Sequence, residues 1–102
     1  MTDTMLAPLE IRITEADGKV DVTAWAGDRA GVMVMSRLSP DRLIIEHTQT
    51  FPGFEGRGFG KRLVFAGAEW ARANGQLLMP LCPFARQIFD RFPEHADVRT
   101  GL

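Results

Sequence analysis

A glycine-rich segment is the first part of this sequence whose residue types predict a chemistry. Between a predicted strand and a predicted helix lies the run Phe54-Glu55-Gly56-Arg57-Gly58-Phe59-Gly60-Lys61. Glycines let a backbone turn with its N–H groups inward, and the N-terminus of the following helix adds a partial positive charge. Arg57 and Lys61 add two cations. The segment therefore predicts a site for a phosphate or a pyrophosphate.

Two familiar phosphate-binding loops do not fit this segment. A P-loop needs Gly-x4-Gly-Lys-Ser/Thr, but Glu55 stands in place of the first glycine and Arg62 in place of the hydroxyl residue. A dinucleotide fingerprint needs Gly-x-Gly-x-x-Gly, and Lys61 replaces its last glycine. A glycine-rich turn without a ligand is the alternative, and the two cations favour the anion site over it.

Cys82 is the candidate nucleophile or acid. It follows an apolar run and precedes Pro83, a residue favoured at the first position of a helix. The partial positive charge at such a helix start favours a thiolate, so an accessible, reactive thiol is expected. The alternative is a buried cysteine that acts as a small apolar side chain.

His47 is the candidate general base. It is expected to share a strand face with Leu43 and Ile45, a position more typical of a core histidine. Glu46, on the opposite face, is the alternative base. His95 lies beyond Pro93 and is expected at the surface.

The rest of the composition excludes several kinds of function. The formal net charge of −1 gives no reason to expect nucleic acid or an anionic membrane as a partner. No Cys/His cluster has the spacing of a metal site, so no metal is expected. No segment approaches the roughly 20 apolar residues that span a bilayer, and the N-terminus lacks the pattern of a secretory signal. A single cysteine fits a reducing compartment, and a cytoplasmic location is predicted.

The elements that must position these residues follow from the apolar pattern. Alternation predicts two strands around Leu9–Ile13 and Val20–Ala24, with a turn at Asp17-Gly18 between them and a longer turn over Ala26–Gly31 after them. Val32–Met35 is apolar on both faces, as expected of a central strand, and Leu43–Thr50, apolar at its start and polar at its end, is the fourth strand. A strand over Leu77–Leu81 and a helix from Pro83 with Phe84, Ile88 and Phe92 on one face complete the chain.

The helix after the glycine-rich segment carries small residues on its apolar face. Gly60, Leu63, Val64, Gly67, Ala68 and Ala71 fall on one side of a helical wheel. Phe65 falls among the charged residues and does not fit the pattern. Asn74-Gly75 ends the helix.

The order of four strands, helix, strand and helix predicts an α+β fold. It is expected to be a mixed, mostly antiparallel five-stranded sheet with two helices, and the last two strands can run parallel because a helix joins them. Residues 1–102 are expected to form one domain, with residues 1–7 as a loose tail.

Taken together, these motifs resemble the GNAT N-acetyltransferases. In that family a Gln/Arg-x-x-Gly-x-Gly/Ala loop lies between the fourth strand and a helix, and Gly58-Phe59-Gly60 matches its glycine end. More closely, the chain resembles a small GNAT-like subfamily with a His-Thr strand, an Arg-Gly-x-Gly-type loop and a Pro-x-Cys-Pro/Ser-Phe segment. The corresponding residues here are Glu46-His47-Thr48, Glu55 to Gly60, Pro80-Leu81-Cys82-Pro83-Phe84 and the closing Arg91-Phe92-Pro93-Glu94, within Gly18 to Asp97.

The resemblance implies that the chain binds acetyl-CoA and acetylates an unidentified amine by direct transfer. It places the pyrophosphate on the loop and the pantetheine between the fourth and fifth strands, with His47 and Cys82 near the thioester. The residues implied to bind the cofactor are Thr50, Phe51, Glu55, Gly56, Arg57, Gly58, Phe59, Gly60, Lys61, Pro83 and Phe84.

Three departures from the family pattern keep alternatives open. Glu55 replaces Gln or Arg, the two N-terminal helices that usually wall the acceptor site are absent, and the sequence has no tyrosine to protonate a leaving thiolate. A CoA-binding module without robust transferase activity is therefore one alternative. A cysteine-dependent acyl-CoA thioesterase that uses Cys82 and His47 is another.

Overall fold

The computed structural model describes residues 9–101, so the predicted tail lies outside the described residues. The elements, in chain order, are β1 (Glu10–Ala16), β2 (Lys19–Ala26), β3 (Asp28–Ser39), β4 (Arg42–Thr50), α1 (Phe59–Ala73), β5 (Leu77–Pro80), α2 (Pro83–Arg91) and the 3₁₀ helix η2 (Pro93–Val98). The predicted element order is confirmed.

One five-stranded sheet carries the fold. Its strands lie in the order β1-β2-β3-β4-β5; the first four are antiparallel neighbours, and β4 pairs with β5 in parallel. Asp17 and Gly18 both have positive φ, 53° and 78°, as a two-residue hairpin turn requires. The α+β fold class with its mixed, mostly antiparallel sheet is confirmed.

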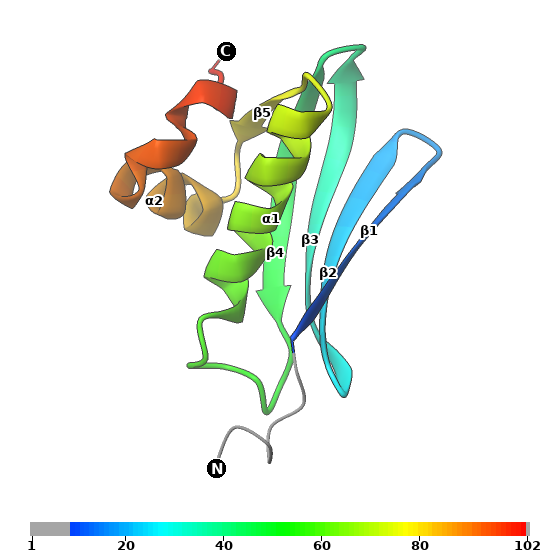
Figure 1. The fold of residues 1–102 in the computed structure, drawn as a ribbon, viewed down its shortest axis with the longest axis vertical. Coiled ribbons are helices and arrows are strands. Elements are labelled where there is room, and N and C mark those ends of the chain that lie inside the picture. Colours follow the sequence, from blue (N-terminus) through cyan, green and yellow to red (C-terminus); the bar gives the residue numbers. More distant parts are fainter. Residues whose placement is uncertain (1–8, 102) are drawn as a thin grey trace.

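Both helices pack into one core on the same side of the sheet (Figure 1). The six residues of α1 that are buried are the six that the wheel predicts. Gly67 lies against Met33 of β3 so tightly that a Cβ at Gly67 would collide with the methionine methyl group. The small residues of α1 therefore allow the helix to pack close to the sheet. This packing positions the N-terminus of α1.

The structure corrects the expected turn over Ala26–Gly31. Strand β3 already begins at Asp28, and only Gly27, with φ 82°, separates it from β2. A β-bulge between Ala24 and Trp25 takes up the extra residue, so Gly31 pairs with Ala24 inside the sheet. Glycine fits at position 31 because the backbone of β4 lies very close: a Cβ at Gly31 would stand 2.8 Å from the carbonyl oxygen of Gln49.

The structure also explains Phe65 and overturns the surface position expected for His95. Phe65 packs edge-on against Phe92, with ring centroids 5.1 Å apart, and its ring lies 4.6 Å from that of His95. His95 is only 6% exposed. The helix η2 folds back over α1, where Arg72 forms two 2.7 Å hydrogen bonds with Asp97.

Within the described residues, no helix is both long and apolar enough to cross a membrane.

Candidate functional site

The glycine-rich loop ends in a helix N-terminus that no side chain caps. Gly53, Gly56 and Gly58 have φ values of 91°, 80° and 78°, which other residues rarely adopt. Gly58 is the N-cap of α1, and the first turn holds no acidic residue. The first amides of a helix lack partners within it, so those of Phe59, Gly60 and Lys61 are available to a ligand.

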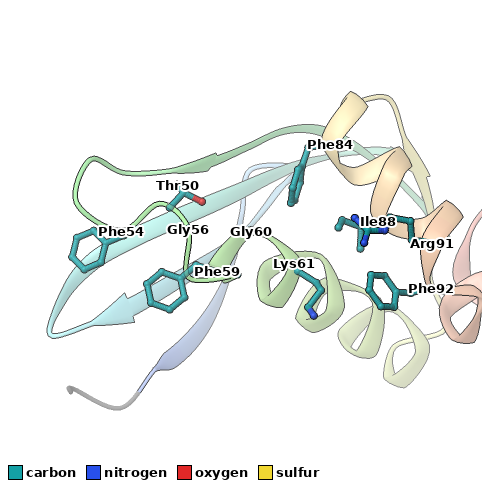
Figure 2. Close-up of a pocket in the computed structure, with 11 residues that line it drawn as sticks. Thr50, Phe54, Gly56, Phe59, Gly60, Lys61, Phe84, Ile88, Arg91 and Phe92 are labelled. Atoms are coloured by element: carbon teal, nitrogen blue, oxygen red, sulfur yellow. The ribbon is translucent and has the colours of Figure 1, made fainter. Parts of the chain in front are cut away.

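A pocket of about 360 Å³ opens between this helix start and α2 (Figure 2). Its volume lies in the range of small-molecule sites. The residues that line it come from the end of β4, the loop, α1 and α2: Thr50, Phe54, Gly56, Gly58, Phe59, Gly60, Lys61, Phe84, Ile88, Arg91 and Phe92.

Two cations line the pocket, and neither forms an ion pair within residues 9–101. Lys61 Nζ lies 5.2 Å from the centroid of the Phe92 ring, and Arg91 Cζ lies 5.9 Å from the same centroid. The pocket lining contains no carboxylate. Its electrostatic character is therefore that of an anion site.

Two charged loop residues expected at the site are absent from the pocket lining. Arg57 lies with Cζ 5.7 Å from the centroid of the Phe54 ring. The carboxylate of Glu55 accepts a hydrogen bond from the N–H of Gly53 at 3.1 Å, so it stabilises the start of the loop. The carboxylate of Glu55 therefore interacts with the backbone of the loop and does not line the pocket.

Thr50 and Phe51 differ in what they can offer a ligand. Thr50 lines the pocket, whereas both polar backbone groups of Phe51 are already paired. The N–H of Phe51 donates to Ala30 at 2.8 Å, and its carbonyl accepts from Phe54 at 3.0 Å. Phe51 would have to lose one of these bonds to pair with a ligand.

Strands β4 and β5 part after Ile45 and Pro80, the last paired residues. The carbonyl of Ile45 accepts from the N–H groups of both Leu81 and Cys82, each at 3.1 Å. The chain then leaves the sheet at Pro83, while β4 continues to Thr50. Since the N–H of Phe51 points toward β3, alternation directs the backbone polar groups of Thr50 and Thr48 toward the open edge.

The structure corrects the position of His47. A β-bulge opposite Val34 and Met35 makes Glu46 an extra residue and shifts the alternation of β4. Leu43 and Ile45 are buried, but His47 is exposed, with Nε2 3.2 Å from Gln49 Oε1. His47 therefore lies on the face of the sheet away from the helices.

Cys82 is the N-cap of α2, as expected, but its thiol is not accessible. The residue is 7% exposed and belongs to the hydrophobic core. Its Sγ lies 3.7 Å from Oγ1 of Thr48. Because neighbouring side chains of a strand point to opposite faces, His47 is directed away from this pair. The structure does not bring Cys82 and His47 together.

Glu46, the alternative base, is held by two neighbours. It accepts a hydrogen bond from Ser36 at 2.5 Å and another from Lys19 at 3.3 Å. These two hydrogen bonds, that from Ser36 first, lower the pKa of the carboxyl group below its usual range. A lowered pKa makes Glu46 a weaker base.

Pro83 is exposed at the start of α2, and Phe84 lies over the start of α1. A Cβ at Gly60 would stand 2.8 Å from Cζ of the Phe84 ring, so a larger residue at position 60 would require the ring to shift. Figure 2 shows this ring on the α2 side of the pocket, facing Gly60.

Four pocket residues are missing from the sequence prediction: Phe54, Ile88, Arg91 and Phe92. A signal for two of them exists, because Phe84, Ile88 and Arg91 are spaced at i, i+4 and i+7 and share a face of α2. No cluster of three His, Cys, Asp or Glu that could hold a metal ion occurs in the part of the chain that the structure describes.

Comparison with known proteins gives a consistent family. A family model described as GCN5-related N-acetyl-transferase matches residues 21–98. A solution structure of a GCN5-like protein from Staphylococcus aureus is 25% identical, with a TM-score of 0.66 over 89% of each chain. The crystal structure of a Bacillus subtilis acetyltransferase in complex with CoA is 21% identical, with a TM-score of 0.65 over 82% of this chain and 74% of that one. No curated protein sequence matches.

Proposed function

Because this chain belongs to the GCN5-related N-acetyltransferase family, we propose that it binds acetyl-CoA and transfers the acetyl group to an amine. The observation that carries the proposal is the uncapped N-terminus of α1, which opens with Gly58 into a pocket lined by Lys61 and Arg91. Backbone amides at a helix N-terminus bind a diphosphate, and the two cations make the pocket as a whole favourable for an anionic ligand.

The chemistry of the pocket fits CoA. The diphosphate would accept hydrogen bonds from the free amides of Phe59, Gly60 and Lys61, and the side chain of Glu55 is engaged elsewhere. The structural relative from Bacillus subtilis was crystallised with CoA, which supports the same ligand here.

The pantetheine arm would run from the pocket along the open edge of β4. The backbone groups of Thr48 and Thr50 that point to this edge can pair with its amides in the manner of an added strand. Thr50 already lines the pocket. A pantetheine arm that begins at the diphosphate would therefore pass Thr50 and then Thr48 before it reaches the point where β4 and β5 separate.

When bound, acetyl-CoA supplies an acetyl group activated as a thioester. His47 is exposed on the uncovered face of the sheet, where it can take the proton that the amine loses on acylation, directly or through water. The amine nitrogen bonds to the acetyl carbon as the carbon–sulfur bond of the thioester breaks. The leaving CoA thiolate takes its proton from solvent, because the chain has no tyrosine to give one. Cys82 lies against Thr48 and serves as a wall of the acyl end of the site.

The thioesterase alternative is less well supported than transfer. A cysteine nucleophile needs a base within hydrogen-bond reach, and the partner of Cys82 in the structure is the hydroxyl of Thr48. His47 is directed to the other face of β4. A CoA-binding module without transferase activity stays a candidate, because within residues 9–101 no helix covers the face of the sheet that carries His47, which gives the acceptor few walls.

Two measurements test the proposal. Calorimetry with acetyl-CoA and, as a control, acetate measures binding, and release of free CoA with a panel of amines measures transfer. We expect saturable binding of acetyl-CoA and CoA release that depends on an amine. Binding with no release for any amine would favour the binding module, release without an amine the thioesterase, and no binding would contradict the proposal.

A further inference from the structure

Two cations line the pocket beside Phe92. Binding of a diphosphate by the backbone amides of α1 does not explain their presence there. Lys61 extends from α1 and Arg91 from the end of α2, and the Phe92 ring lies near both (Figure 2). Lys61 is half-buried at this position.

Neither cation has a carboxylate partner within residues 9–101, although other basic residues of the protein do. Arg72 pairs with Asp97 at 2.7 Å, and Arg99 pairs with Asp90 at 2.7 Å. A cation that packs on an aromatic face gains some attraction, but two like charges beside one ring repel each other. A bound anion in reach of both would remove that repulsion.

The pocket thus offers two separate anion-binding groups. One is the set of amides at the start of α1, beside Gly58 and Gly60, and the other is the pair of side chains beside Phe92. A ligand that satisfies both needs a diphosphate and a second phosphate at a distance from it. CoA meets this requirement, and dephospho-CoA, which lacks the phosphate on its ribose, does not.

We propose, on the basis of the acetyl-CoA binding proposed above, that Lys61 and Arg91 bind the 3′-phosphate of CoA. The protein then selects CoA over dephospho-CoA. Arg91 presents a planar fork of donors that suits a phosphate, and Lys61 adds a point charge.

The test is a comparison of two ligands across four proteins. Dissociation constants for CoA and dephospho-CoA are measured by calorimetry for the unaltered protein, Lys61→Gln, Arg91→Gln and Arg62→Gln. Arg62→Gln is the matched control, because it removes the same charge from the neighbouring exposed position of α1, outside the pocket. Thermal melts without ligand check that each variant is folded.

We expect the unaltered protein to bind CoA about tenfold or more tightly than dephospho-CoA, as charge-assisted hydrogen bonds to one phosphate imply. Arg91→Gln and Lys61→Gln should each lower this ratio several-fold, mainly by weakening CoA, and Arg62→Gln should keep it. An equal affinity of the unaltered protein for both ligands overturns the assignment. So does an equal loss for both ligands in Lys61→Gln and Arg91→Gln, since it would place these cations at the diphosphate. Failure to bind either ligand is a different result and contradicts the acetyl-CoA site itself.

Discussion

The ring of Phe84 lies against the backbone of Gly60, so closely that a methyl group at position 60 would stand 2.8 Å from Cζ and 2.9 Å from Cε2. This contact joins the first turn of α2 to the first turn of α1, the two elements that enclose the pocket. Phe84 is 38% exposed, so Phe84→Ala removes the ring without the loss of a core residue.

We expect the effects of substitutions at Gly60 and Phe84 to depend on each other. Gly60→Ala should cost about 1 kcal/mol of unfolding free energy in the unaltered protein, because the collision with the ring outweighs the helix propensity gained. In Phe84→Ala the same change should be neutral or stabilising. Urea unfolding of the four proteins measures the coupling. The same change in both backgrounds would show that the ring does not restrict position 60.

The glycine at position 58 can be tested against a glycine with the same φ. Gly58 and Gly18 both have φ 78° and open space where a Cβ would lie, but Gly18 is in the β1–β2 turn, away from the pocket. Alanine should cost each site about 1–2 kcal/mol, the strain of a left-handed residue. Only Gly58→Ala should weaken acetyl-CoA binding as well, because it lies at the amides of α1. Equal binding by both variants would move the diphosphate elsewhere.

Cys82 should react slowly with iodoacetamide in the folded protein. The residue is 7% exposed and packed in the core, so opening must precede alkylation. The rate in the native protein should be at least about tenfold below that in denaturant, measured by intact mass. Rapid alkylation of the native protein would restore the accessible thiol that the sequence predicts. Because Cys82 is the only cysteine, the modified site needs no further identification.

His47 and Glu46 are competing bases that kinetics can separate. His47→Gln should lower kcat about a hundredfold or more and leave the dissociation constant for acetyl-CoA unchanged, as loss of a general base implies. Glu46→Gln should retain kcat within a few-fold, because Ser36 and Lys19 already hold its carboxylate and keep its pKa low. The opposite pattern would assign the base to Glu46.

The attachment of η2 to α1 should weaken in acid. The hydrogen bonds from Arg72 lower the pKa of Asp97 below its usual value of about 3.9. A group with a lowered folded-state pKa stabilises the fold above its unfolded pKa and loses that effect as the pH falls through the folded value. Asp97→Asn should therefore reduce stability at pH 7 and make little difference near pH 2, by urea unfolding. Glu94→Gln, which removes a charge from the same short helix, serves as the control and should show a smaller difference at pH 7.

Much of the fold follows from local patterns in the sequence. Alternation in β1 and β2, the Asp17-Gly18 turn and the buried face of α1 each depend on residues within a few positions of one another. The loop and the N-cap position of Cys82 are local for the same reason, since a helix start is set by the residues beside it. These features could be predicted, and the structure confirms them.

The tertiary structure decided which side chains meet. One extra residue in β4, opposite Val34 and Met35, turns His47 away from the helices and leaves Thr48 beside Cys82, and no short-range pattern contains that bulge. Arg91 reaches the pocket only because α2 folds back beside α1, and His95 is buried only because η2 packs on Phe65. Periodicity along one element shows which face is buried, but the partner on the other side of the contact depends on packing between segments distant in sequence.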